Sequence, residues 1–251
     1  MSESFSERRG RGKQVDSELS VSGLVPLSAV DFPGRLSAVV FCQGCPWRCG
    51  YCHNPHLLTR TSGQLSWPEI CAFLGRRQGL LDAVVFSGGE PTLQRGLGEA
   101  MRETHGLGFS VGLHTAGPYP RRIQALLPHL DWVGMDVKAP FSTYPLITGA
   151  RGSGERARRS AQILVASGIE CEFRTTVDPA LLDAESIMRI ADELSALGVK
   201  RWVLQEARYE GRINPATVVM GTDPAIWSPE FVENLRRRFP VFLVRRAAIF
   251  G

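Results

Sequence analysis

The feature that most constrains this chain is a cluster of cysteines early in the sequence. Four of the six cysteines fall in AVVFCQGCPWRCGYCHNP, residues 38–55: Cys42, Cys45, Cys49 and Cys52. The apolar run from Leu36 to Phe41 comes just before them, and Gly and Pro are frequent around them. This pattern predicts a buried strand that delivers thiols to an irregular loop at its carboxyl end. Thiolates so close in sequence can converge on one small inorganic group, either an Fe–S cluster or zinc.

The spacing of the cysteines supports two alternatives. A structural zinc ion needs four N or S ligands, which the pairs Cys42/Cys45 and Cys49/Cys52 could supply. The gap between these pairs is short, however, and the pleat of the strand fixes the direction of Cys42. A four-iron cluster held by Cys45, Cys49 and Cys52 alone would leave one iron open to a substrate. The spacing favours the open cluster over zinc.

The composition is that of a soluble globular protein with a substantial core, because 43% of the residues are hydrophobic and 22% are charged. The net charge of +4 is modest. Part of it comes from residues 1–20, a polar stretch that we predict to be disordered. This tail has no aromatic residues interleaved with its basic ones, so it does not indicate a nucleic-acid partner. We expect residues 21–251 to form the folded domain.

The sequence does not indicate secretion or a membrane. Residues 1–20 lack the apolar segment of a secretory signal, and no apolar run approaches the length that spans a bilayer. We therefore expect a cytoplasmic protein. In that reducing compartment, clustered cysteines are more often metal ligands or redox groups than disulfides.

Predicted strands and helices alternate along the chain. The expected strands are residues 36–42, 83–86, 109–113, 132–137, 170–177, 201–205 and 241–244, and from Val21 only a short apolar lead-in is expected. The expected helices are residues 66–77, 93–104, 121–130, 155–167, 184–197 and 229–239. Alternation of this kind predicts an α/β fold, with a parallel sheet curled into a partial or full (β/α) barrel.

Polar segments follow the predicted strands: CPWRCGYC, SGGEPT, HTAG, DVKAP, TTVDP and QEARYEG. Active sites of parallel α/β sheets lie at the carboxyl ends of the strands. We therefore expect these segments to meet at one mouth of the sheet. This convergence is the strongest sequence argument for an enzyme.

Taken singly, most of these segments have ordinary explanations. The GGEP sequence at residues 88–91 is most simply a turn before a helix, although paired glycines also let a ligand approach the backbone. Asp136 and Lys138 would be worth little as an exposed charge pair, whereas at the mouth Lys138 could hold a carboxylate. Arg174 is either solvent-facing or an anion holder. We expect Cys71 and Cys171 to be ordinary buried thiols.

The motifs together carry a family resemblance. The C-x3-C-x2-C run, GGEP and the later DxK resemble the radical SAM family, and YCHNP with an upstream DFPG resembles the activating enzymes of glycyl-radical proteins. Over VPLSAVDFPGRLSAVVFCQGCPWRCGYCHNP, the chain is most similar to activating proteins of anaerobic ribonucleoside-triphosphate reductases. Pyruvate formate-lyase activases are a close second.

This resemblance implies a set of site residues. Cys45, Cys49 and Cys52 would ligate three irons of a [4Fe–4S] cluster, and S-adenosylmethionine would chelate the fourth. The positions that match cofactor-binding residues of the family are Tyr51 near the adenine, Gly88, Gly89 and Glu90 at the methionyl amine, Thr115, Asp136 and Lys138 around the methionyl and ribose groups, and Arg174 and Gln205 at later strands.

The resemblance also implies the activity and the partners. Reductive cleavage of S-adenosylmethionine would give a 5′-deoxyadenosyl radical, which removes a hydrogen from a glycine of a partner enzyme. That partner would be an anaerobic ribonucleotide reductase, with reduced flavodoxin or a ferredoxin-type protein as electron donor. A pyruvate formate-lyase type activase is one alternative. A small-molecule enzyme such as 7-carboxy-7-deazaguanine synthase is another, although the HNP after Cys52 argues against it. A zinc-stabilised nucleic-acid-binding module is the weakest of the alternatives.

Two residues depart from the family pattern. His114 stands where related activases often carry an acid that helps to bind a monovalent cation, which puts such a cation in doubt here. Cys42 is additional to the three-ligand pattern, and the sequence assigns it no role.

Overall fold

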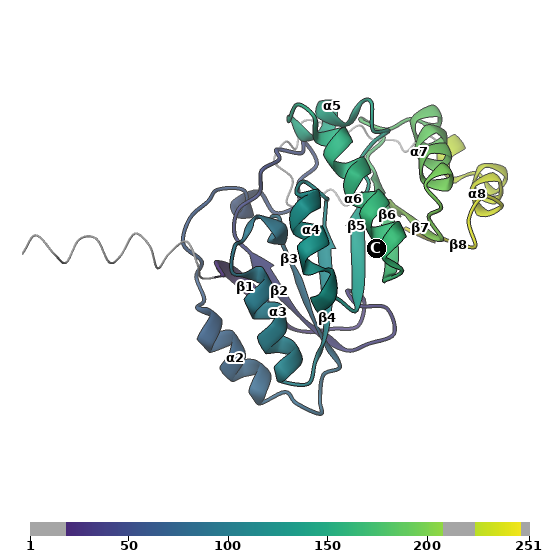
Figure 1. Ribbon diagram of the computed structural model, residues 1–251. Coiled ribbons are helices and arrows are strands. Elements are labelled where there is room, and N and C mark those ends of the chain that lie inside the picture. The colour runs from purple at the N-terminus through teal and green to yellow at the C-terminus, as the bar shows by residue number, and fades with distance from the viewer. Residues whose placement is uncertain (1–18, 208–223, 247–251) are drawn as a thin grey trace, which may run out of the picture.

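The computed structural model describes residues 19–207 and 224–246 (Figure 1). Its centre is an eight-stranded sheet in which the strands lie side by side in chain order. The strands are β1 (Val21–Ser28), β2 (Ser37–Cys42), β3 (Ala83–Gly88), β4 (Ser110–Thr115), β5 (Trp132–Asp136), β6 (Glu170–Val177), β7 (Arg201–Glu206) and β8 (Val241–Arg245). All neighbouring pairs are parallel except β1 and β2, which are antiparallel.

Helices connect the strands. The α-helices are α2 (Trp67–Gly75), α3 (Leu97–Gly106), α4 (Pro120–Leu126), α5 (Tyr144–Thr148), α6 (Ser153–Ser167), α7 (Ala184–Ala196) and α8 (Pro229–Arg236). The short 3-10 helices are η1 (Pro55–Leu57), η2 (Pro91–Leu93), η3 (Leu127–His129) and η5 (Pro224–Trp227). Among the described residues, no helix is both long enough and apolar enough to cross a lipid bilayer.

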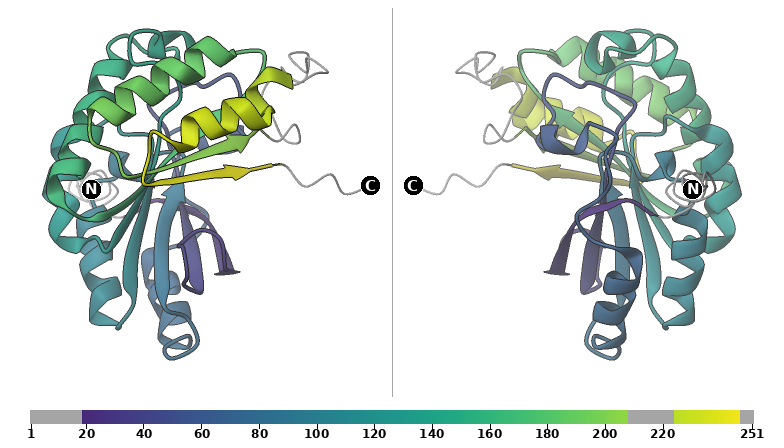
Figure 2. Two further views of the ribbon diagram at one scale, coloured as in Figure 1. Left: turned by 90° about the vertical axis from the view of Figure 1, so that its right-hand side faces the viewer. Right: turned by 90° about the vertical axis from the view of Figure 1, so that its left-hand side faces the viewer.

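The sheet is a partial barrel, which confirms the predicted α/β class. Figure 2 shows that it is bent, with helices on its outer side. Within the described residues the strands form an open series from β1 to β8, with no pairing between these two edges. The buried, Val-rich strands β2 and β3 account for the parallel centre, because such strands are covered on both faces.

The helix predicted after the cysteine loop also formed as its sequence indicates. Ser66 caps α2: its side chain accepts a hydrogen bond from the Glu69 amide, and the Glu69 side chain accepts one from the Ser66 amide. Pro68 lies in the first turn, where a missing N–H costs nothing. The predicted boundaries elsewhere agree within a few residues.

Three parts of the fold differ from the prediction. The lead-in from Val21 is a strand, β1, whose Gly and Pro residues hide the usual alternation. The helix predicted to begin at Leu93 was wrong at its start, because the chain forms η2 there and α3 begins only at Leu97. The five-residue helix α5 had no recognisable periodicity in the sequence.

The predicted disordered tail falls mainly on residues 1–18, which lie outside the described residues. Leu19 is buried, and the Ser20 carbonyl accepts a hydrogen bond of 2.9 Å from the Gln43 amide. The chain is therefore already attached to the sheet just before β1.

The loop between β1 and β2 packs against the sheet. Phe32, from the DFPG sequence, packs against Trp132 of β5 with 5.3 Å between ring centroids and the rings tilted by 33°. Both belong to a small apolar cluster with Val39, Ala83 and Val85 that is separate from the main core. The loop therefore reaches across the sheet to β5, and this placement brings it to the site described next.

Candidate active site

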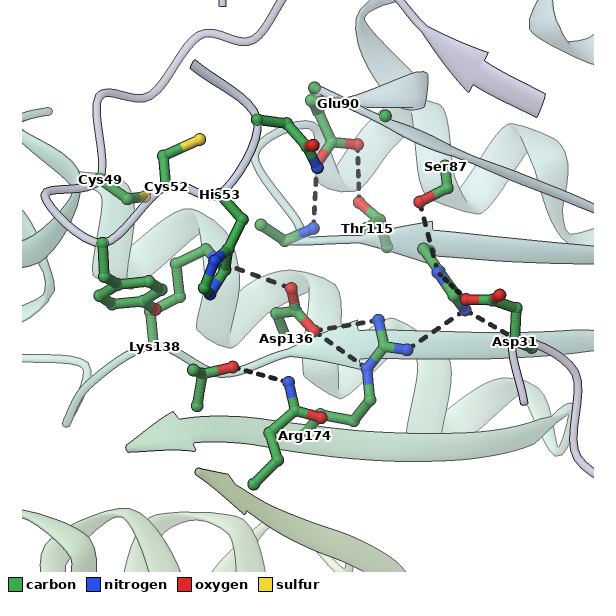
Figure 3. Close-up of a pocket in the computed structure, with 18 of the residues that line it drawn as sticks. Asp31, Cys49, Cys52, His53, Ser87, Glu90, Thr115, Asp136, Lys138 and Arg174 are labelled. Carbon is green, nitrogen blue, oxygen red and sulfur yellow. Dashed lines mark hydrogen bonds and ion pairs between the residues drawn. The ribbon is translucent and has the colours of Figure 1, made fainter. Parts of the chain in front are cut away.

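A cavity of about 760 Å³ lies at the carboxyl ends of the strands. Every site residue predicted from the sequence lines it: Cys45, Cys49, Tyr51, Cys52, Gly88, Gly89, Glu90, Thr115, Asp136, Lys138, Arg174 and Gln205. Figure 3 shows Cys49, Cys52 and Lys138 on one side, Asp31 and Ser87 on the other, and Asp136 between them. The prediction that the polar segments after the strands meet at one mouth of the sheet is therefore confirmed.

The cysteine loop is held mainly by its backbone. The Gly44 amide donates to the Leu57 carbonyl at 2.8 Å, and the Cys45 amide donates to Leu58 at 3.2 Å. Cys42, by contrast, is fully buried in the main core and does not line the cavity. The structure thus separates three cavity thiols from the fourth cysteine of the cluster.

Arg48 ties the middle of this loop in place. Its amide donates to the Thr148 carbonyl of α5 at 2.9 Å. Its guanidinium donates to the carbonyls of Cys45 and Trp47 at 2.8 and 3.0 Å. The exposed arginine therefore stabilises the backbone between Cys45 and Cys49.

The cavity thiols form a donor set that fits an iron–sulfur group. Burial raises the pKa of Cys45 to about 12 and also raises the pKa of Cys49, so binding a metal there must release protons. Among the described residues, no three Cys, His, Asp or Glu side chains converge closely enough to share one metal ion. Soft thiolate donors spread over a cavity wall suit a cluster of iron and sulfide better than a single zinc ion.

The Gly88–Gly89 turn packs directly against the cysteine loop. Gly88 has φ of +119°, and a Cβ there would lie 2.3 Å from the Cys42 carbonyl oxygen. A Cβ on Gly89 would lie 2.4 Å from the Gly44 carbonyl oxygen. Both glycines are therefore required for the close approach of the two segments, whatever else they bind.

Glu90 connects the turn after β3 to the end of β4. Its buried carboxylate accepts hydrogen bonds from the amide of Thr92 at 3.1 Å, the hydroxyl of Thr115 at 2.8 Å and the amide of Ala116 at 2.9 Å. Burial raises the pKa of Glu90, and these hydrogen bonds counteract part of that rise. The carboxylate thus fixes Thr115 at the cavity wall.

Asp136 is the centre of a charged group at the end of β5. Arg174 donates to its carboxylate from Nε at 3.0 Å, and the Lys138 ammonium lies 3.5 Å from the other oxygen. Burial alone would raise the pKa of Asp136, but the charges of Arg174 and Lys138 outweigh it and lower that pKa. Arg174 is therefore an internal partner and not a solvent-facing residue.

Lys138 also contacts an aromatic ring of the cysteine loop. Its Nζ lies 5.4 Å from the centroid of Tyr51. Burial would lower its pKa, but Tyr51 and Asp136 outweigh burial, and the pKa lies well above the ordinary value. The Tyr51 hydroxyl is buried without a hydrogen-bond partner in the described structure. Lys138 is thus a charged ammonium that lies between Tyr51 of the cysteine loop and Asp136 at the end of β5.

His114 contributes a neutral imidazole to the wall of the cavity. Its Nδ1 lies 3.3 Å from the Ser87 hydroxyl, and its Nε2 lies 3.0 Å from the Asp31 carbonyl oxygen and 3.2 Å from Arg174 Nη1. Burial, followed by the charge of Arg174, lowers the pKa of His114. The side chain is therefore uncharged at neutral pH.

The far end of the cavity is formed by the last strands. Gln205 donates to the Thr176 hydroxyl at 2.7 Å. Arg245 of β8 makes a bidentate ion pair with buried Glu172, at 2.8 and 3.0 Å. Arg245 also lines the cavity, so the outermost strand contributes a positive side chain to the site.

Sequence reasoning missed several residues of the site. Trp47 lines the cavity from between the cysteines, and Asp31 reaches it from the β1–β2 loop. In the sequence, DFPG contributes only to the family resemblance and does not indicate a cavity residue. Tyr144 of α5 contacts the backbone of both Asp136 and Lys138. A buried tyrosine eight residues after a strand-end aspartate gives no local signal of such a contact.

These features are those of an enzyme with an open α/β barrel. Its cavity lies at the carboxyl ends of the strands and is lined by thiols and charged side chains. A model of the Radical SAM superfamily matches residues 39–194. The chain therefore belongs to the Radical SAM superfamily, and its cofactors are those of that family, a [4Fe–4S] cluster and S-adenosylmethionine.

Individual relatives agree with this assignment. The chain is 35% identical over 181 residues to a protein of Methanocaldococcus jannaschii that is provisionally named a glycyl-radical enzyme activating enzyme, covering 68% of this chain and 73% of the relative. It is 31% identical over 182 residues to the pyruvate formate-lyase-activating enzyme of Clostridium pasteurianum, covering 68% of this chain and 74% of the relative.

A solved structure shares the fold. The structure of SuiB from Streptococcus suis with its precursor peptide matches with a TM-score of 0.62 and 14% identity, over 82% of this chain and 48% of that one. The chain thus spans about half the length of that protein, and the likeness concerns the fold.

Proposed function

We propose that this chain activates a glycyl-radical enzyme, and that its partner is an anaerobic ribonucleoside-triphosphate reductase. The observation that carries the proposal is that the three thiols and the charged strand-end residues line one cavity, whose lining extends from the β1–β2 loop to Arg245 of β8. The names of the two relatives described above support the activase class. The similarity of residues 25–55 to activating proteins of anaerobic ribonucleoside-triphosphate reductases supports the reductase as partner.

The cavity residues are proposed to hold the cofactors. Cys45, Cys49 and Cys52 would bind three irons of the cluster, and the reduced cluster supplies the electron that cleaves S-adenosylmethionine homolytically. The residues proposed to bind S-adenosylmethionine are Tyr51 at the adenine, Gly88, Gly89 and Glu90 in the turn at the amine, Lys138 at the carboxylate, Thr115 and Asp136 nearby, and Arg174 and Gln205 at the later strands.

The charged groups of the cavity are suited to binding and not to proton transfer. Asp136 has a lowered pKa, Lys138 a raised one, and His114 stays neutral. A general acid or base works best with a pKa near the working pH. Hydrogen-atom abstraction needs no such group, so the electrostatics agree with a radical reaction in which side chains orient the reactants.

The opening of the barrel provides a route for a macromolecular substrate. Val30 of the β1–β2 loop lines the cavity and is 78% exposed, and Arg245 at the end of β8 and Arg246 just after it also line the cavity. A glycine-bearing loop of the partner would enter between these two edges. We also propose that the electron donor is reduced flavodoxin or a ferredoxin-type protein, because the cluster needs a low-potential reductant. We propose a cytoplasmic location as well.

A pyruvate formate-lyase type activase is the second candidate, since the Clostridium pasteurianum relative carries that name. The two candidates differ only in the partner. The proposed chemistry is the same, so purified partners are needed to choose between them.

The test is anaerobic incubation of the cluster-loaded chain with S-adenosylmethionine, a reductant and each candidate enzyme. Electron paramagnetic resonance should show a glycyl-radical doublet with the reductase and none with pyruvate formate-lyase. A doublet only with the lyase would move the assignment to the second candidate. Absence of a doublet with either enzyme, alongside 5′-deoxyadenosine formed without any protein partner, would instead indicate a small-molecule substrate.

A further inference from the structure

Tyr144 is a buried tyrosine whose hydroxyl is used entirely by the backbone of the site. The residue is 0% exposed and begins α5. Its hydroxyl accepts a hydrogen bond from the Lys138 amide at 3.0 Å and donates one to the Asp136 carbonyl oxygen at 3.2 Å. One oxygen atom therefore bridges the peptide groups on either side of Val137.

The other side of the same backbone is fixed by the sheet. The Val137 amide donates to the Arg174 carbonyl of β6 at 2.7 Å. Beyond Asp136 the regular pairing of β5 ends. Tyr144 thus replaces a neighbouring strand at the point where the chain leaves the sheet, and it fixes the base from which the Lys138 side chain extends.

The ring of Tyr144 contacts the opposite wall of the cavity. It packs edge-on against Trp47, with 5.7 Å between centroids, and Trp47 lies between Cys45 and Cys49. The same short helix accepts the Arg48 amide at the Thr148 carbonyl. Helix α5 therefore contacts both the cysteine loop and the strand end that carries Lys138.

We propose that Tyr144 is a positioning residue that sets the affinity for S-adenosylmethionine by fixing the backbone of Lys138, while its ring supports the cysteine loop. The inference rests on the role of Lys138 as the carboxylate holder in the proposed function. A lysine has a long flexible side chain, so its ammonium is placed only if its backbone is fixed. Without the hydroxyl, the Lys138 amide and the Asp136 carbonyl would be left without this partner in a buried setting.

The test separates the hydroxyl from the ring. Tyr144→Phe removes only the oxygen, so we expect unchanged iron and sulfide content. We expect a rise of about three- to tenfold in the Kd for S-adenosylmethionine, the size of one or two lost hydrogen bonds. The Kd is read from the change that S-adenosylmethionine produces in the spectrum of the reduced cluster. Phe141→Leu, in the ring stacked on Tyr144 at 6.0 Å, is the matched control and should leave the Kd within about twofold.

A double-mutant cycle distinguishes positioning from a general structural role. If Tyr144 acts through Lys138, Tyr144→Phe should weaken binding no further in a Lys138→Ala background. Equal weakening in both backgrounds would overturn the proposal, as would an unchanged Kd in the single variant. Both results are independent of any protein partner, so they do not depend on the identity of the glycyl-radical enzyme.

A measurement on the unaltered protein guards against a variant that fails to fold. The amide proton of Lys138 should exchange with deuterium as slowly as the amides within β5, because the Tyr144 hydroxyl protects it. Exchange at the rate of an exposed loop would contradict the proposed contact.

Discussion

The two walls of the cavity are built by different means. The cysteine wall is an irregular segment held through its backbone, with amides of Gly44, Cys45 and Arg48 donating to carbonyls elsewhere. The strand-end wall is regular in backbone and is held through its side chains, where the Asp136 carboxylate pairs with both Arg174 and Lys138. The first wall can therefore lose a cysteine side chain and keep its shape, whereas the second depends on its charges.

The largest expected effect tests whether the thiols are replaceable without loss of the fold. Cys49→Ala should reduce the iron and sulfide bound after anaerobic reconstitution to a small fraction of wild type, while the circular dichroism of the chain stays the same. The reason is that the Cys49 side chain lines the cavity and the loop is held by backbone contacts.

Cys42→Ala is the matched control, because this cysteine is equally close in sequence but does not line the cavity. It should retain the cluster and lose only about 1 kcal/mol of stability. Equal loss of iron in both variants would show that Cys42 also holds the cluster and would contradict the separation of the three cavity thiols from Cys42.

The second prediction concerns the close contact between the cysteine loop and the turn after β3. Gly89→Ala should destabilise the chain by about 3 kcal/mol in urea unfolding, because the new methyl group meets the carbonyl oxygens of Gly44 and Leu57 at 2.4 and 2.7 Å. Gly50→Ala, in open space within the same loop, should change the free energy of unfolding by less than about 0.5 kcal/mol. Equal free energies of unfolding for the two variants would contradict the claim that the close backbone contact at Gly89 holds the cysteine loop in place.

The third prediction tests the charges of the strand-end wall. Arg174→Gln should cost about 2 kcal/mol in the free energy of unfolding at pH 7, since Asp136 loses the guanidinium that lies 3.0 Å away, keeps Lys138 at 3.5 Å, and is itself a third exposed. Arg238→Gln, in an exposed pair with Asp192, should cost less than about 0.5 kcal/mol.

The same variant has a defined pH dependence. Because the pKa of Asp136 is lowered in the folded chain, its stabilisation is present above the ordinary aspartate pKa and is lost as the pH falls through the lowered value. The difference between wild type and Arg174→Gln should therefore shrink below about pH 4. A constant difference down to pH 3 would mean that the pair does not contribute through charge.

The smallest effect concerns His114. Its pKa is lowered in the folded chain, so unfolded chains bind the extra proton first and stability falls as the pH drops below the ordinary histidine value. Wild type should lose on the order of 1 kcal/mol between pH 7 and pH 5 through this residue, and His114→Gln should lose less. Parallel pH profiles for the two proteins would indicate that His114 is not held neutral.

The residues of the two walls could be predicted from the sequence to different extents. The thiols, the GGEP turn and the DxK pair were predicted because they are local patterns that follow apolar strands. The ion pair of Asp136 with Arg174 was not predicted, because it joins residues of neighbouring strands whose register is set only by the folded sheet. Likewise, nothing local to Tyr144 indicates that its hydroxyl meets the strand end, and the weak alternation of β1 hid an edge strand.

The central claim is that both walls serve one cofactor site. It is tested most directly by the spectrum of the reduced, anaerobically reconstituted chain with and without S-adenosylmethionine. The account predicts about four irons per chain and a spectrum that shifts on addition of the compound, with a weaker shift in Lys138→Ala. Zinc in place of iron, or an iron signal that S-adenosylmethionine leaves unchanged, would contradict it.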